Sequence, residues 1–255
     1  MLPGTVCVLP DGPARHVQVL RMQPGGLIQL FDGQGQEHQA RVTEMGRKQV
    51  TVEIEGAISV DRELPVKVTL AMGMPANDRM DSLVEKATEL GVHAIQPLMC
   101  ERSVLRLDGE RALKKVAHWQ AVAVSACEQS GRAVVPEIRP VQTLQAWLKG
   151  SAVETVGTSW RKGVLSLREA VGLREWLEGN SCVAATPGGA SASTSDGEQA
   201  APAFVFLSGP EGGLSESEEL AALNAGWTAI TLGARVLRAD TAPLAALSVI
   251  GATLA

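Results

Sequence analysis

The sequence contains no tyrosine, only three phenylalanines and only four cysteines among its 255 residues. The scarcity of tyrosine and phenylalanine argues against a surface that stacks single-stranded bases on aromatic rings. The cysteines form no Cys-x-x-Cys pair and are scattered over the chain, at Cys7, Cys100, Cys127 and Cys182. This spacing indicates neither a disulfide framework nor a zinc site, and it is typical of free thiols in a reducing cytoplasm.

Long apolar runs and an excess of positive charge are missing too. No apolar run approaches the roughly 20 residues that a membrane-spanning helix needs, and the first five residues lack the basic head and apolar core of a signal peptide. We therefore expect a cytoplasmic protein without a membrane segment. The net charge of -5 counts against tight binding to free RNA, which usually needs a basic surface. The four histidines are dispersed, so we expect no metal site.

What is present is an ordinary soluble composition, 45% hydrophobic and 20% charged, in a chain long enough for one large or two modest domains. The first part of the chain is expected to form several short strands, which is typical of a small β-barrel. Strand-like runs cover residues 6–9, 16–20, 27–31, 39–42 and 50–54, and Asp32-Gly33 predicts a hairpin.

From Pro65 the pattern changes to alternating strands and helices. Strands are predicted at residues 66–72 and 92–98, joined by a helix that begins near Asn77 or Asp78 and ends at Gly91. A longer helix is expected at residues 110–130. This alternation indicates a parallel sheet with flanking helices, so the sequence predicts an α/β protein.

The region that follows is less regular. Residues 141–180 are expected to form a helix around Trp147, a strand at 153–156 and a helix at 167–177. Residues 186–202 are small, polar and bounded by proline, so they cannot bury enough apolar surface to offset their ordering entropy. We expect them to form a mobile insert loop between strands around Cys182 and Phe204. The expected domains are residues 1–69 and 70–255.

The most informative stretch begins at Phe204. Phe204-Val205-Phe206-Leu207 has the length and composition of a buried strand, and it runs into Gly209-Pro210-Glu211-Gly212-Gly213. Glycine lets the backbone approach a ligand closely. Ser215, with Glu218 three residues later, predicts a capping box that opens a helix. In α/β proteins, ligands bind beyond the carboxyl ends of strands at such places.

A second stretch has the same plan. Ile230-Thr231-Leu232 predicts a strand, Gly233 and a polar turn follow, and an Ala/Leu-rich helix runs to the end of the chain. Neither loop has the glycine pattern of a Rossmann fingerprint or the Gly-Lys-Ser/Thr of a P-loop. The two loops are therefore predicted to form a small-molecule site of another kind. Two tight strand-to-helix turns are the less favoured alternative, because the first loop is unusually rich in glycine.

The two loops together resemble the paired signature of the 16S ribosomal RNA uracil-N3 methyltransferase family of the SPOUT superfamily. The resemblance rests on Gly209-Pro210-Glu211-Gly212-Gly213 and Leu232-Gly233-x-Arg235-Val236-Leu237-Arg238-x-Asp240-Thr241-Ala242. It extends upstream to Lys86-Ala87-Thr88-Glu89-Leu90-Gly91-Val92, Glu101-Arg102-Ser103, Glu128-Gln129-Ser130-x-Arg132, Val19-Leu20-Arg21-Met22 and Phe31-Asp32-Gly33. It implies a PUA-like barrel that seats RNA, a carboxyl-terminal domain tied in a trefoil knot, and a homodimer. One departure is Asp240, where the family usually has Glu.

The resemblance also implies the cofactor, S-adenosylmethionine, and the part of the chain that holds it. The expected cofactor-binding residues come from the two loops: Leu207, Ser208, Gly209, Pro210, Glu211, Gly212, Gly213, Leu232, Gly233, Val236, Leu237, Arg238 and Thr241. Glu211 is expected either to accept hydrogen bonds from the cofactor or to hold its own loop by bonding nearby amides.

The implied reaction requires a uracil anion, because N3 carries a proton at neutral pH. One charged hydrogen bond is worth roughly 1.5–3 kcal/mol, which corresponds to about one to two pKa units. A single arginine that donates to a uracil carbonyl can supply this stabilisation. Arg238 or Arg132 is the expected catalytic residue, with Arg235 in reserve. The alternative for Arg235 and Arg238 is a salt bridge to Asp240 or Glu211.

The implied partner is the small ribosomal subunit and its 16S RNA. The candidate RNA contacts are Arg15, His16, Arg21, Arg102, Glu128, Gln129 and Arg132. The alternative is that they are solvated surface charges or a network at a helix end. Two other functions remain open: a ribose 2′-hydroxyl methyltransferase of the same superfamily, and a ribosome-assembly factor without catalytic activity.

Overall fold

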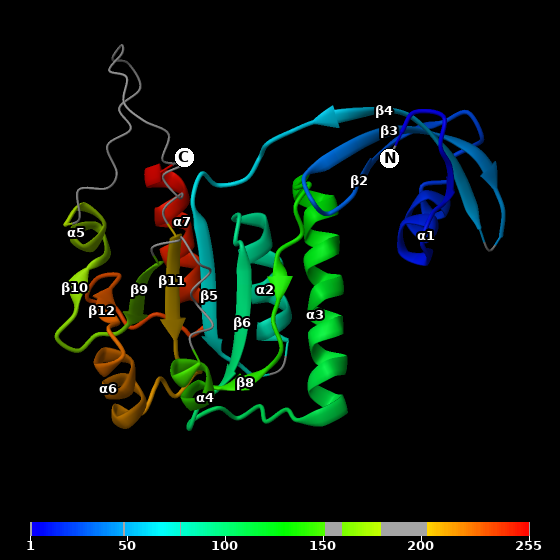
Figure 1. The fold of residues 1–255 in the computed structure, drawn as a ribbon. Helices are drawn as coiled ribbons and strands as arrows, with labels where there is room; N and C mark the ends of the chain where they lie inside the picture. The colour runs from blue at the N-terminus through cyan, green and yellow to red at the C-terminus, as the bar shows by residue number, and fades with distance from the viewer. Residues whose placement is uncertain (1, 48, 77, 151–159, 180–202, 255) are drawn as a thin grey trace, which may run out of the picture. The chain divides into compact units, whose positions relative to one another are not determined.

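The computed structural model describes residues 2–47, 49–76, 78–150, 160–179 and 203–254 (Figure 1). The chain divides into two compact units, Met1–Glu63 with Cys127–Val135 and Leu64–Ala126 with Pro136–Ala255. The domains expected from the sequence, residues 1–69 and 70–255, remain a prediction. The strands expected at 153–156 and around Cys182, the insert at 186–202 and the possible cap at Asn77 lie outside the described residues.

The first unit contains a four-stranded antiparallel sheet, one whole helix and, at residues 127–130, the end of a second helix. Its strands lie in the order β1-β4-β3-β2. The apolar core of the unit lies between the sheet and the helix and includes Val17, Val42 and Val52. The elements are β1 (Val6–Val8), α1 (Asp11–Val19), β2 (Leu27–Phe31), β3 (Gln36–Met45) and β4 (Val50–Ser59).

The strand expected at residues 16–20 is wrong, because these residues belong mainly to α1. Ala14 and Val17, three residues apart, are buried on one face of the helix, while Val19 is 73% exposed. The alternation of Val17 and Val19 therefore resembled a strand, but only one of the two faces the core. Pro13 is compatible with the helix because it stands in the first turn, where no backbone N–H is needed.

The second unit is built around a parallel sheet in the order β10-β12-β9-β11-β5-β6-β7, with β8 paired to β6. Every strand pair in it is parallel. Its elements are β5 (Lys67–Gly73), α2 (Arg79–Glu89), β6 (Ala94–Met99), α3 (Gly109–Ser130), β7 (Glu137–Ile138), β8 (Gln142–Thr143), α4 (Leu144–Lys149), β9 (Trp160–Leu165), β10 (Val171–Gly172), α5 (Leu173–Glu178), β11 (Ala203–Ser208), α6 (Glu216–Asn224), β12 (Thr228–Thr231) and α7 (Thr241–Leu254). The α/β class with an antiparallel first part and a parallel second part is thus confirmed.

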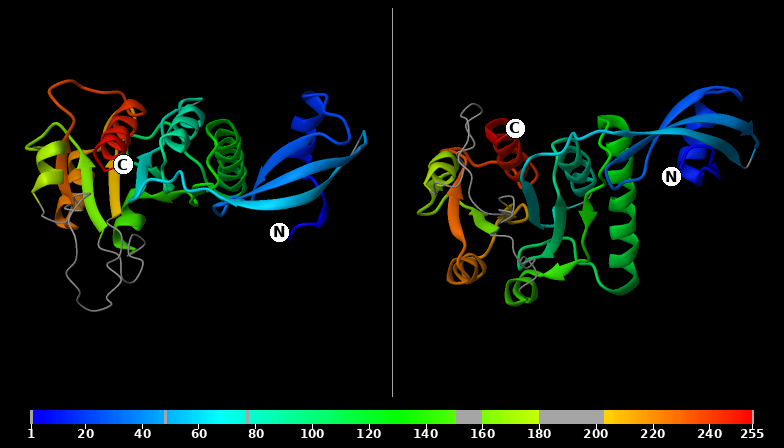
Figure 2. Two further views of the ribbon diagram at one scale, coloured as in Figure 1. Left: turned by 90° about the horizontal axis from the view of Figure 1, so that it is seen from above. Right: turned by 45° about the horizontal axis from the view of Figure 1, so that its top comes forward.

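Helices cover both faces of this sheet (Figure 2). Because β11 is buried on both sides, its side chains alternate between two cores. Val205 and Leu207 pack in a cluster with Trp147 of α4 and Ala222 of α6. Phe204 and Phe206 contact Trp176 of α5 on the other side, with ring centroids 5.9 and 5.8 Å apart. Within the described residues, the helices are too short or too polar to cross a membrane.

Strand β9 was missed, and the helix expected at 167–177 is shorter than predicted. β9 contains Arg161, Lys162 and Gly163 and so lacks a continuous apolar run. Arg161 nevertheless lies in the sheet, because its guanidinium stacks 4.1 Å from the ring centroid of Trp176. A side chain at position 163 would lie 2.4 Å from Ile230, so glycine fits the crowded centre of the sheet. The trefoil knot concerns chain threading, which strand order does not test, and stays a prediction.

Candidate functional site

A cavity of about 610 Å³ lies in the second unit, beyond the carboxyl ends of β9, β11 and β12. These three strands are neighbours in the sheet. The loops that leave them, residues 165–168, 208–214 and 232–239, form most of its wall. The lining residues are Arg79, Arg102, Leu165, Ser166, Leu167, Arg168, Ser208, Gly209, Pro210, Glu211, Gly212, Gly213, Leu214, Glu219, Ile230, Leu232, Arg235, Val236, Leu237, Arg238, Ala239 and Ala242.

The 208–214 loop has a conformation that favours glycine at positions 209 and 213. A Cβ at Gly209 would lie 2.5 Å from the backbone nitrogen of Leu214, and Gly213 has a φ of +69°. The turn is closed by the N–H of Gly213, which donates to the carbonyl of Pro210 at 2.8 Å. Pro210 itself packs against Gly73 at the end of β5, where a Cβ would lie 2.5 Å from the proline ring.

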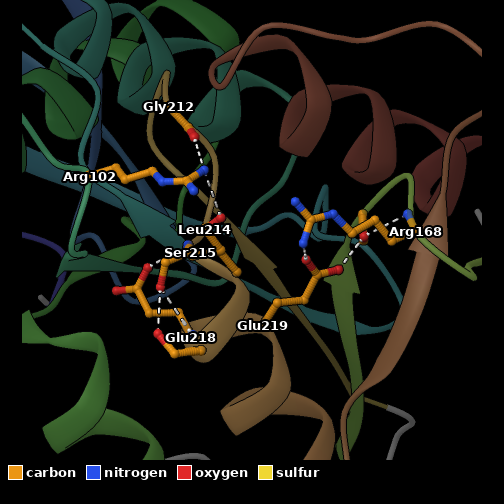
Figure 3. Close-up of polar contacts among 9 residues, drawn as sticks. Arg102, Arg168, Gly212, Leu214, Ser215, Glu218 and Glu219 are labelled. Carbon is orange, nitrogen blue, oxygen red and sulfur yellow. Dashed lines mark hydrogen bonds and ion pairs between the residues drawn. The ribbon is translucent and has the colours of Figure 1, made fainter.

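Side chains from the segments after β5 and β6 hold this loop. Oε1 of Glu211 accepts from the backbone N–H of Ala76 at 2.9 Å and lies 3.4 Å from Nη1 of Arg79. Nη1 of Arg102 donates to the carbonyls of Gly212, at 2.8 Å, and Leu214, at 3.3 Å (Figure 3). These contacts support the second of the two roles considered for Glu211, holding its own loop.

The helix after the loop begins with the predicted capping box. The hydroxyl of Ser215 accepts from the N–H of Glu218 at 3.2 Å, and the carboxylate of Glu218 accepts from the N–H of Ser215 at 3.0 Å. The other oxygen of Glu218 accepts from the N–H of Glu101 at 2.7 Å. The start of α6 is therefore tied to the turn after β6.

A polar cluster on the opposite wall was not predicted, because it depends on the missed strand β9. The hydroxyl of Ser166 donates to Glu219 and accepts from the N–H of Arg168 at 3.0 Å. The guanidinium of Arg168 points towards the same carboxylate, at 3.8 Å, as Figure 3 shows. The Glu219 side chain is only 13% exposed, so this carboxylate belongs to the wall of the cavity.

Among the described residues, the hydrogen bonds of the 232–239 loop are local. The hydroxyl of Thr231 donates to the carbonyl of Gly233 at 3.0 Å, and the carbonyl of Arg238 accepts from the N–H groups of Thr241 and Ala242, both at 3.0 Å. Val236 is 83% exposed, and Arg235 and Arg238 are also exposed. Oδ1 of Asp240 is buried and has no hydrogen-bond partner among the described residues.

Most of the predicted cofactor residues line the cavity. They are Ser208, Gly209, Pro210, Glu211, Gly212, Gly213, Leu232, Val236, Leu237 and Arg238. The other three do not line it: Leu207 is buried inside β11, Gly233 stands beside Leu232, and Thr241 begins α7. The two glycine-bearing loops therefore share one cavity. The sequence did not indicate the cavity-lining residues of the 165–168 loop, nor Arg79 and Glu219.

The predicted RNA contacts lie elsewhere, except for Arg102. Arg15, His16 and Arg21 are exposed in the first unit, and Glu128 and Gln129 are exposed at the end of α3. Nδ1 of His16 lies 3.8 Å from Oε2 of Glu128. Arg132 is buried, and its guanidinium forms a two-pronged ion pair with Glu63 in the first unit.

The charges around the cavity set it apart from the acidic chain as a whole. Five arginines and two glutamates line it, so the cavity has an excess of positive charge. The thiol of Cys100, in the turn after β6, is no nucleophile at neutral pH, because burial raises its pKa to about 12. Among the described residues, no group of three or more His, Cys, Asp or Glu side chains is placed to hold a metal ion.

Comparison with known proteins agrees with this geometry. A model of the RNA methyltransferase domain matches residues 62–251, and a model of the RNA methyltransferase PUA domain matches residues 9–55. Ribosomal RNA small subunit methyltransferase E of Bacillus subtilis is 32% identical over 92% of this chain and 84% of its own length.

Two solved structures are similar over almost the whole chain. Ribosomal RNA small subunit methyltransferase E of Neisseria gonorrhoeae, bound to S-adenosylmethionine, is 39% identical with a TM-score of 0.82, covering 98% of this chain and 93% of that one. A Legionella pneumophila methyltransferase in complex with the same cofactor is 32% identical with a TM-score of 0.82, covering 99% and 94%. This chain therefore belongs to the RNA methyltransferase family whose relatives include ribosomal RNA small subunit methyltransferase E.

Proposed function

We propose that this protein transfers a methyl group from S-adenosylmethionine to N3 of one uridine in small-subunit ribosomal RNA. The observation that carries the proposal is the single cavity formed by the 208–214 and 232–239 loops, which contain both halves of the family signature. The names of the relatives support a small-subunit RNA methyltransferase. The choice of N3 rests on the family resemblance.

The cavity suits S-adenosylmethionine in size and chemistry. Its volume of about 610 Å³ falls within the range of small-molecule pockets, roughly 300–1,000 Å³. Leu165, Ile230 and Leu237 supply apolar wall, and the loop backbones supply donors and acceptors for the adenine and the amino-acid end. Glu219 supplies a carboxylate that can accept from the ligand's ammonium or hydroxyl groups.

The bound cofactor would supply an electrophilic methyl group on a sulfonium whose leaving group departs neutral. The N3 proton must first leave to solvent water. The protein must then hold the acceptor nitrogen in line with that methyl group, exclude water and stabilise the uracil anion. Arg238 lines the cavity, and we assign it the last role, as a donor to a uracil carbonyl where negative charge develops. Arg132 is the alternative candidate for that role, although its pairing with Glu63 favours a structural one.

We further propose that the first unit seats the RNA. The PUA-domain match covers residues 9–55, and Arg15, His16 and Arg21 are exposed there. Each is expected to contact phosphate or sugar, which positions the substrate without reading its sequence.

We also expect the protein to be a cytoplasmic homodimer. Light scattering at micromolar concentration measures its oligomeric state, and a result that shows only monomer would refute the dimer.

Two measurements test the function. Titration calorimetry should give heat with S-adenosylmethionine and with its demethylated product, and no heat with either would overturn the proposal. Mass spectrometry of nuclease-digested ribosomal RNA from a deletion strain should show one missing N3-methyluridine, restored by the gene. A missing ribose methylation would favour the 2′-hydroxyl alternative, and an unchanged map would favour an assembly factor.

A further inference from the structure

We infer that Arg102 is a positioning residue of the proposed cofactor site, which fixes the 208–214 loop in its binding conformation and is not primarily an RNA contact. This inference rests on the proposed function for its ligand, but its structural part can be tested without any ligand. The residue was a candidate RNA contact from its sequence motif alone.

The first support is the pair of hydrogen bonds that Arg102 donates. Both go from the same nitrogen, Nη1, to backbone carbonyls of the loop, Gly212 at 2.8 Å and Leu214 at 3.3 Å. These two carbonyls flank Gly213, whose positive φ turns the chain. A charged donor placed across this turn stabilises the one backbone conformation that presents the loop to the cavity.

The second support is the packing of the Arg102 stem. A Cβ at position 212 would lie 3.1 Å from Cβ of Arg102 and 3.4 Å from its Cδ. Gly212 has an ordinary φ, so its lack of a side chain is explained by this close approach and needs no ligand. The loop and the arginine therefore fit each other at both the stem and the guanidinium.

The third support is that the turn carrying Arg102 is itself fixed. The N–H of Ser103 donates to the carbonyl of Cys100 at 3.1 Å, and the hydroxyl of Ser103 accepts from the N–H of Cys100 at 2.9 Å. The neighbouring N–H of Glu101 donates to Glu218 in the capping box of α6 at 2.7 Å. The turn thus holds the loop and the helix that follows it, from a part of the chain more than 100 residues away.

Arg102→Met is the decisive variant, because methionine keeps an apolar stem next to Gly212 and removes both donors. Without ligand, hydrogen exchange at the amides of Gly213 and Ser215 should become about tenfold faster. Affinity for S-adenosylmethionine, measured by calorimetry, should fall about tenfold. Arg102→Lys should change hydrogen exchange and cofactor affinity much less than Arg102→Met, because the lysine ammonium carries enough donors for two carbonyls.

Arg111→Met is the matched control, since Arg111 is an exposed arginine of α3 that does not line the cavity. Arg111→Met removes one positive charge, as Arg102→Met does. It should leave hydrogen exchange at Gly213 and Ser215 and affinity for S-adenosylmethionine unaltered. Binding of both variants to small ribosomal subunits should fall equally, by less than about twofold, because each removes one charge.

Unchanged exchange and cofactor affinity in Arg102→Met, with RNA binding lost specifically, would overturn the inference and make Arg102 an RNA contact. A fall in thermal stability without any change at residues 209–215 would also overturn it. If the unaltered protein binds no S-adenosylmethionine, the proposed function fails, while the exchange comparison still decides the role of Arg102.

Discussion

The 208–214 and 232–239 loops face the same cavity but are held in different ways. The first receives hydrogen bonds from Arg102 and bonds the N–H of Ala76 through Glu211, so residues far away in the sequence fix it. The second is bonded within its own neighbourhood, through Thr231 and the carbonyl of Arg238. Its Val236 is 83% exposed, whereas Leu214 of the first loop is 8% exposed.

From this difference we infer that the two loops have different roles in the site. A loop that is already fixed costs little conformational entropy when a ligand binds, so it suits the part that recognises the cofactor. A loop with exposed side chains and few distant contacts is free to adjust when cofactor and substrate arrive. We therefore expect changes in the first loop to impair cofactor binding, and changes in the second to impair catalysis.

The largest effect is expected for Gly209→Ala. The new Cβ would lie 2.5 Å from the nitrogen of Leu214, which is backbone and cannot move without opening the loop. Overpacking of this kind costs roughly 1–3 kcal/mol, so affinity for S-adenosylmethionine should fall about 5- to 150-fold in calorimetry. Gly172→Ala is the control, because Gly172 has a φ of -63° and nothing near its Cβ position. Equal affinity for both variants would contradict the first half of the comparison.

Arg238→Ala should have an effect of similar size on a different quantity, the rate of methyl transfer. Loss of one charged hydrogen bond to the uracil anion costs roughly 1.5–3 kcal/mol, or about a 10- to 150-fold fall in kcat. Cofactor affinity should change less than about threefold, because we expect the cofactor to be held mainly by the other loop. Single-turnover methylation of small subunits measures the first and calorimetry the second. A loss of affinity with normal kcat would reverse the roles assigned to the loops.

The same two loops show how much of the structure could be predicted from the sequence. The strand before the first loop and the capping box after it were predicted from an apolar run and from the spacing of Ser215 and Glu218, and both are confirmed. Such signals are local, because neighbouring residues in the sequence make the contacts. The two glycine-bearing loops were predicted to share a site, and they line one cavity.

The rest depends on contacts between distant residues. Nothing near Arg102 in the sequence indicates that its guanidinium bonds two carbonyls more than 100 residues away. Strand β9, and with it the cluster of Ser166 and Glu219, was missed because β9 contains Lys162 and Gly163, two residue types that are depleted in strands. In α1, the alternation of Val17 and Val19 is typical of a strand, whereas the three-residue spacing of Ala14 and Val17 is typical of a helix. The segment is a helix, and Ala14 and Val17 are buried on one face of it.

A smaller effect is expected for Ser215→Ala, which removes the hydroxyl of the capping box. Loss of an N-cap residue costs about 1 kcal/mol, so urea denaturation should show a decrease of that size in the free energy of unfolding. Ser217→Ala is a suitable control, because its hydroxyl contacts that of Ser215 but caps no backbone N–H among the described residues. Equal stability of the two variants would show that the box does not hold the start of α6.

A further prediction concerns the packing beneath the first loop. Burial raises the pKa of Cys100 to about 12 from a reference value of 9.0. Above pH 9 the unfolded chain loses this proton before the folded chain does, so stability should fall as the pH rises from 9 towards 12. At pH 10 this loss of stability is roughly 1–2 kcal/mol. Cys100→Ala should show a flatter pH dependence in urea denaturation, and an unchanged slope would contradict this packing.

Hydrogen exchange with and without S-adenosylmethionine tests the central claim most directly. If the cavity between the two loops binds the cofactor, amides in residues 208–214 and 232–239 should both become protected. The gain should be larger in the second loop, whose hydrogen bonds among the described residues are local. Protection of neither loop, or protection confined to another part of the molecule, would contradict the account.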